Sequence, residues 1–78
     1  MIIIYSKHSL ERMHQRGISK ETVELTILRP DRTQYKVEEK VAIKTIDKSV
    51  VIVVFKEMDD VIFVITTYKS SKISRYIS

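Results

Sequence analysis

The sequence has no cysteine, tryptophan or asparagine, and only one glycine and one proline in 78 residues. The absence of cysteine excludes a disulfide framework and a thiolate metal site. A single glycine excludes a glycine-rich phosphate loop, and no serine lies in a recognisable nucleophile motif. The longest apolar run, residues 50–55, is far below the ~18 residues of a membrane-spanning helix. We therefore expect no metal centre, no cofactor and no membrane segment.

The length predicts one domain, residues 1–78, with one hydrophobic core. Such a short chain buries only about 60% of its unfolded surface, so oligomerisation or a bound partner would add useful stability. The run Ile2 to Ile4 is too short for the core of a signal peptide and soon meets a charge at Lys7. We expect a cytoplasmic protein. Richness in isoleucine, valine and lysine, without asparagine or cysteine, is typical of a thermophilic source.

The formal net charge of +4 is unevenly distributed. Residues 1–20 and residues 69–78 are both basic, and the stretch between them is mildly acidic. If the fold brings the two ends together, they form one positive surface, which is typical of proteins that bind nucleic acid or another polyanion. The alternative is two solvated basic faces that bind nothing. The basic residues of the two ends are Lys7, Arg12, Arg16, Lys20, Lys69, Lys72 and Arg75.

The order of the residue patterns predicts an α+β fold of the order β-α-α-β-β-β-β, with an antiparallel sheet and two short helices on one face. Ser6 and Ser19 are good N-caps, Gly17 suits a left-handed helix end, and Pro30 stops the second helix. The expected strands are residues 1–5, 33–37, 41–46, 49–57 and 61–68, and the expected helices are residues 6–16 and 19–29. The tail, residues 69–78, suits a last strand or a single helical turn.

The apolar positions predict which faces are buried. Leu10 and Met13 should face the core from the first helix, and Val23, Ile27 and Leu28 from the second. The central strands are apolar on both sides, whereas two short helices cover only one face. The second face should therefore be covered by the tail, a second subunit or a partner. A homodimer or a tight hetero-complex is expected.

His8, Arg12 and Arg16 follow one another at intervals of four residues, without an acidic residue at that spacing. On a helix, residues four apart lie on one face. The imidazole can move a proton near neutral pH, and guanidinium groups suit phosphates. His14 is six residues from His8 and falls on another face, so the two histidines do not suit a joint metal site.

The segment KHSLERMHQRGIS resembles the opening of a family of small bacterial and archaeal proteins. These are catalogued as a domain of unknown function with an H-x-x-x-R-M-x-x-R-G-I-S opening, and they look like relatives of the RelE/ParE toxin superfold and of BrnT-type toxins. Beyond Pro30 the resemblance rests on the order of the strands. It implies a RelE-like fold and membership of a toxin–antitoxin pair.

RelE-type toxins cleave messenger RNA, often on the ribosome, whereas ParE-type relatives act on gyrase and cleave no RNA. In RelE-type cleavage the RNA's own 2′-hydroxyl attacks, so the protein needs a base, an acid and cations, and no metal. RelE enzymes place basic residues and often a tyrosine on the sheet and the tail. By position in the chain, the comparable residues here are Lys44, Lys56, Tyr68, Lys69 and Arg75.

The resulting hypothesis is a RelE-like toxin or toxin-derived protein that binds RNA and cleaves it without a metal, with a cognate antitoxin as a further partner. The alternative is a non-catalytic protein-binding or regulatory module of the same fold. The candidate catalytic residues are His8, Arg12, Arg16 and Tyr68. The candidate nucleic-acid contacts are Lys7, Lys44, Lys69, Lys72 and Arg75.

Each candidate also has a structural interpretation. His8 can hydrogen-bond within its own helix turn, and Tyr68 can pack at the edge of the sheet. Arg12 and Arg16 can pair with acids such as Glu57 or Asp60 and brace the helix on the sheet. Asp59 and Asp60 are more simply turn residues than a metal pair.

Overall fold

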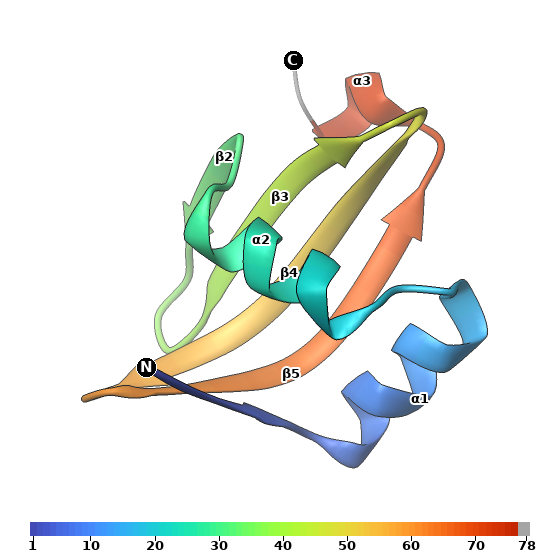
Figure 1. Cartoon of the computed structure of the whole chain (residues 1–78). Coiled ribbons are helices and arrows are strands. Elements are labelled where there is room, and N and C mark those ends of the chain that lie inside the picture. The colour runs from blue at the N-terminus through green and yellow to red at the C-terminus, as the bar shows by residue number, and fades with distance from the viewer. Residues whose placement is uncertain (77–78) are drawn as a thin grey trace.

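The computed structural model describes residues 1–76 and confirms the α+β order of elements (Figure 1). The tail forms a helical turn after the last strand, which decides between the two predicted alternatives, and its residues 77–78 lie outside the described part. The elements are β1 (Ile2–Tyr5), α1 (Lys7–Arg16), α2 (Lys20–Leu28), β2 (Arg32–Tyr35), β3 (Lys40–Ile46), β4 (Ser49–Met58), β5 (Val61–Ser70) and α3 (Ile73–Tyr76).

The five strands form one sheet in the order β1-β5-β4-β3-β2. The antiparallel pairing predicted from the short turns is confirmed for β2 to β5. β1 departs from that prediction, because it pairs with β5 in parallel and makes the sheet mixed. No hairpin joins β1 to β5, so turn length, which forces neighbouring strands to run antiparallel, does not act on this pair.

The predicted helix ends are confirmed by the backbone. The Ser6 side chain accepts a hydrogen bond from the Ser9 N–H at 2.9 Å, and the Ser19 side chain accepts one from the Thr22 N–H at 3.1 Å. Gly17 ends α1 with φ 65°, a left-handed conformation that costs glycine little. α1 and α2 therefore begin and end where local chemistry requires.

Both long helices cover one face of the sheet, which we call the helix face, as Figure 1 shows. Met13, Ile18 and Val23 pack there against the sheet. Burying such side chains contributes about 1.5–3 kcal/mol each. The sheet residues of this core are Ala42, Val51, Val53, Phe55, Ile62 and Val64.

Two of the predicted buried positions are wrong. Leu10 is 42% exposed and Leu28 is 60% exposed, whereas Ser9 and Thr26 are fully buried. The Ser9 hydroxyl donates to the Ser6 carbonyl, and the Thr26 hydroxyl donates to the Thr22 carbonyl, each at 2.8 Å. Because these hydroxyls are satisfied within their own helices, small side chains can face the sheet at close range.

The opposite side of the sheet, which we call the open face, is covered in part. Tyr76 of α3 packs against a cluster formed by Val41, Ile43, Val50 and Ile52. Further toward β1 the open face leaves large apolar side chains in solvent. They are Ile2 (59% exposed), Ile4 (46%), Met58 (68%) and Phe63 (41%).

A β-bulge in β5 changes which side chains face the helices. Phe55 pairs with Val64, but Val54 pairs with Thr66, so Ile65 is an extra residue in β5. Val64 lies on the helix face, and Thr66, two residues further on, lies with Val54 on the open face. A regular strand would put both on the same side.

Candidate nucleic-acid interface

The basic series, which is our name for His8, Arg12 and Arg16, lies on α1 beside the buried stripe of that helix. Ser9 and Met13 face the sheet. At roughly 100° per residue, His8 and Arg12 lie on one flank of that stripe. His8 and Arg16 are exposed and Arg12 is half-buried. The predicted helix is confirmed, and the imidazole and both guanidinium groups are presented from it.

Two contacts place α1 along the second half of β5. At its start, the Ser6 hydroxyl donates to the Ile65 carbonyl at 2.8 Å. At its end, Gly17 and Ile18 line a cleft of about 230 Å³ together with Lys69. β1 pairs with β5 only as far as Val64, so α1 occupies the position beyond the end of β1. The basic series and the end of β5 are therefore neighbours.

Tyr68 and Lys69 follow each other on β5 and point to opposite faces. Tyr68 pairs with Ile52, a residue of the open face, and is 46% exposed. Lys69 pairs with Val51 of the helix face and is exposed beside the turn between α1 and α2. Lys69 is thus the candidate of β5 that lies on the same face as the helices.

The ion pairs of the described residues all lie in the middle of the chain. Lys40 pairs with Glu57 at 2.7 Å, and the hydrogen bond to Glu57 raises the pKa of Lys40. The other two pairs join Lys44 to Asp31 and Lys56 to Glu38, each at 3.9 Å.

The arginines of α1 make no such pair. Within residues 1–76, Arg12 and Arg16 have neither an ion pair nor a side-chain hydrogen bond, so bracing by Glu57 or Asp60 is not found. The same holds for Lys7, Lys69, Lys72 and Arg75. Three acidic residues of the middle thus pair with lysines of the middle, and none of the ion pairs within residues 1–76 involves the basic ends.

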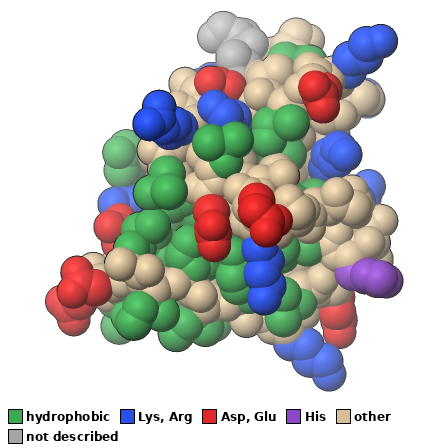
Figure 2. All heavy atoms as spheres, in the orientation of Figure 1, with side chains coloured by type: hydrophobic (Ala, Val, Ile, Leu, Met, Phe, Trp, Pro, Cys, Tyr) green, Lys and Arg blue, Asp and Glu red, His purple; other side chains and the backbone are tan. Residues whose placement is uncertain are grey.

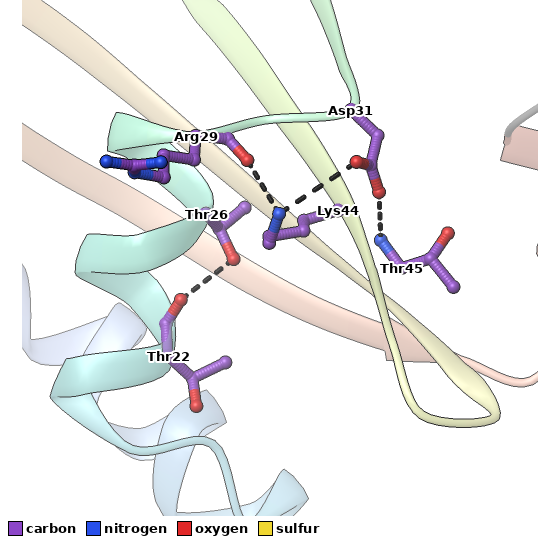
Figure 3. A network of polar contacts seen from close by, with 6 residues as sticks. All are labelled: Thr22, Thr26, Arg29, Asp31, Lys44 and Thr45. Carbon is purple, nitrogen blue, oxygen red and sulfur yellow. Dashed lines mark hydrogen bonds and ion pairs between the residues drawn. The ribbon is translucent and has the colours of Figure 1, made fainter.

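Lys44 has a different environment from the other candidates (Figure 3). Its Nζ donates to the Arg29 carbonyl at 2.8 Å and lies 3.9 Å from the Asp31 carboxylate, and its side chain is 20% exposed. Asp31 also accepts a hydrogen bond from the Thr45 N–H at 2.7 Å. Lys44 thus ties the segment between α2 and β2 to β3, which is a reason to leave it out of the interface.

The remaining basic candidates are exposed around α1 and the tail. Lys7 is the first residue of α1, Lys72 lies between β5 and α3, and Arg75 lies in α3. Figure 2 shows a histidine on the right of the molecule, where α1 lies, with Lys or Arg side chains above it on the same side. Of the second basic end, Lys69 lies beside α1, whereas Lys72 and Arg75 lie at α3, which packs against β4 on the open face. The two basic ends therefore meet only in part.

Sequence reasoning missed the shape of the open face. A cleft of about 850 Å³ lies there between the segment from β2 to β3 and the Phe63 and Ile65 side chains, with Lys56 in its wall. A second cleft of about 420 Å³ continues past Met58. Phe63, Ile65 and Met58 share the open face only because of strand register, which the apolar pattern alone does not reveal.

Within residues 1–76 no group of three or more histidine, aspartate or glutamate side chains is placed to hold a metal ion. None of the helices in that part of the chain is long and apolar enough to span a membrane. The side chains of α1 offer imidazole, guanidinium, ammonium, carboxylate, amide and hydroxyl groups.

Fold and surface define a small α+β domain with a basic helix along one edge of a mixed sheet. The chain belongs to the family described as domain of unknown function DUF4258, whose sequence profile matches residues 5–69. That match runs from the end of β1 to Lys69 and includes all of α1. No curated protein and no solved structure gives a significant match.

Proposed function

We propose that this protein is a RelE-like toxin, or a protein derived from one, that binds RNA at α1 and the end of β5 and cleaves it without a metal. The observation that carries the proposal is a row of cations on and beside α1 that have no ion-pair partner within residues 1–76, on the same helix as an exposed imidazole. His8, Arg12 and Arg16 share α1, and Lys69 lies beside its end. Clustered cations without acid partners supply the salt-dependent attraction for phosphates.

The proposed chemistry needs only proton transfer and charge stabilisation. A base removes the proton of the RNA 2′-hydroxyl, whose oxygen attacks the adjacent phosphorus and forms a 2′,3′-cyclic phosphate. The bond to the 5′-oxygen breaks, and an acid protonates that oxygen. His8 serves as base or acid, and Arg12 and Arg16 hold the phosphate. Tyr68 lies on the open face, across the sheet from α1, and is given no role in this step.

Partners and setting follow from the same proposal. The substrate is messenger RNA, free or on the ribosome, and the protein acts in the cytoplasm together with a cognate antitoxin. A neighbouring open reading frame for a small DNA-binding protein would support this setting. Its absence would favour an orphan or regulatory protein.

RNA cleavage in the presence of a chelator, with and without ribosomes, tests the mechanism. We expect His8→Ala to lose about 10²–10⁴-fold in cleavage rate, as for other general acids and bases, and Arg12→Ala to weaken both binding and cleavage. His14→Ala is the matched control, because His14 is an exposed histidine of the same helix on another face. Equal activity of wild type, His8→Ala and Arg12→Ala would remove α1 from the mechanism.

The open face favours a second candidate, a non-catalytic module that binds a protein partner. Its cleft of about 850 Å³ is lined by Phe63 and Ile65 and remains uncovered by α3 in the described structure. This candidate predicts no cleavage by the wild-type protein and a complex that is insensitive to salt. Binding of RNA that weakens steeply with salt would instead support the RNA-binding proposal.

A further inference from the structure

The two edges of the sheet differ in how they resist pairing with another chain. The β2 edge carries Arg32 and Gln34, follows Pro30 and leads into Lys36. Charged residues and proline protect an edge strand from further pairing. β1 consists of Ile2, Ile3, Ile4 and Tyr5, with no charge and no proline, and its only neighbour in the described sheet is β5.

The hydrogen bonds of β1 show which of its backbone groups are free. The Ile2 N–H donates to the Asp60 carbonyl at 2.9 Å, and the Ser6 N–H donates to the Val64 carbonyl at 3.0 Å. Successive residues of a strand point their amides to opposite sides, so the amides of Ile3 and Tyr5 point outward, away from β5. α1 lies beyond the end of β1, against β5, and leaves this outer side uncovered.

We propose that β1 pairs antiparallel with β1 of a second copy, with a two-fold axis through Ile3. In this register Ile3 faces Ile3 of the second copy, and their outward N–H and carbonyl groups form two hydrogen bonds. Ile2 then faces Ile4 of the second copy in the closely spaced, non-hydrogen-bonded position. Both isoleucines lie on the open face, so the pairing brings exposed apolar side chains together.

The same register keeps each face of the sheet intact across the axis. Ile2 and Ile4 share the open face with Val61 and Phe63, and Ile3 shares the helix face. A register shifted by one residue would put side chains of opposite faces beside each other. A two-fold axis through Ile4 would also match hydrogen bonds and faces, but it would place Ile2 opposite the polar Ser6. The two-fold register about Ile3 is the one that places the exposed Ile2 and Ile4 side chains opposite each other.

A second copy fits this edge better than an unrelated strand because the pairing is self-complementary and closes at two chains. Each chain has one unprotected edge strand, β1. An isologous contact pairs both of these edges with each other, so no free edge remains to extend the assembly into a fibre. Strands of four residues cover less than the roughly 800 Å² per partner of a standard interface. The exposed Met58 and Phe63 beside the strand add apolar area. We expect a dimer that dissociates in the micromolar range.

Sedimentation equilibrium from about 1 to about 200 μM tests the dimer at the concentrations where such a contact forms. Ile2→Lys and Ile4→Glu should each weaken the dimer at least about tenfold, because each puts two charges into apolar positions. The double variant carrying both changes should restore it, since each introduced ammonium group then faces an introduced carboxylate of the second copy. Val37→Lys is the matched control, at a fully exposed valine of the turn between β2 and β3.

Circular dichroism checks that each variant is folded. Amide hydrogen exchange of the wild type tests the β1 pairing without any variant. The amides of Ile3 and Tyr5 should exchange more slowly as the protein concentration rises, while amides of β2 should not change. A wild type that is monomeric at every concentration refutes the proposal. A dimer that Ile2→Lys leaves unchanged, or that the double variant does not restore, also refutes this register.

Discussion

Replacing Lys44 with methionine keeps the aliphatic length of the side chain and removes its ammonium group. The change deletes a charge-assisted hydrogen bond to the Arg29 carbonyl and the contact with Asp31. A hydrogen bond to a charged group contributes about 1.5–3 kcal/mol, and an ion pair at this exposure contributes at most about 1 kcal/mol. Since methionine packs better and water can reach the exposed Arg29, we expect a net loss of about 1–2 kcal/mol.

Urea unfolding measures this loss as a lower midpoint at unchanged m-value, and thermal unfolding should show a decrease of about 4–8 °C per kcal/mol for a domain of this size. Lys48→Met is the control, because Lys48 is exposed and has no ion pair within residues 1–76. Lys69→Met should show the opposite pattern, with normal stability and weaker RNA binding. Our assignment of Lys44 would be falsified if Lys44→Met kept normal stability and lost RNA affinity as Lys69→Met does.

Two further changes test groups that are buried without a hydrogen-bond partner. Burial, with the nearby charges of Glu24 and Glu21, raises the pKa of Tyr5 above its usual 10.0. The folded state thus holds the phenolic proton more tightly than the unfolded chain, so stability is full below pH 10.0 and falls as the pH rises through the raised pKa. In Tyr5→Phe this loss of stability at alkaline pH should shrink, while stability at pH 7 should be unchanged. Urea midpoints measured across the pH range test this. An unchanged alkaline loss would show that ionisation of Tyr5 is not its cause. The Thr67 hydroxyl is fully buried and has no hydrogen-bond partner among residues 1–76. Thr67→Val should therefore stabilise the protein by about 1 kcal/mol, and a lower melting temperature would mean that the hydroxyl has a partner.

The order of elements could be predicted because local signals mark it. Ser6, Gly17, Ser19 and Pro30 each act on neighbouring backbone, so the helix ends were correct. The direction of β1 could not be predicted, because its partner β5 is distant in sequence and no turn joins them. Local sequence patterns do not predict features that depend on pairing between segments distant in the sequence.

The buried positions of the helices show a second limit. Hydrophobic spacing favoured Leu10 and Leu28, but Ser9 and Thr26 face the sheet. A hydroxyl that bonds its own helix behaves as a small, satisfied side chain, and the apolar pattern does not count it. For the site, the sequence predicted the series His8, Arg12 and Arg16. The pairing of Lys44, and the lack of an ion pair for Arg12 within residues 1–76, appear only in three dimensions.

The bulge that accommodates Ile65 decides which side chains lie on each side of the sheet near the end of β5. If β5 kept Ile65 but continued past Val64 in regular alternation, without the bulge, Lys69 would move to the open side and Tyr68 would turn toward the helices. The cation would then leave the neighbourhood of Arg16, and the phenol would replace it. Relatives should therefore be compared by their spacing at this point as well as by the residues that they share, since a relative without the bulge keeps the two roles only if it also lacks one residue.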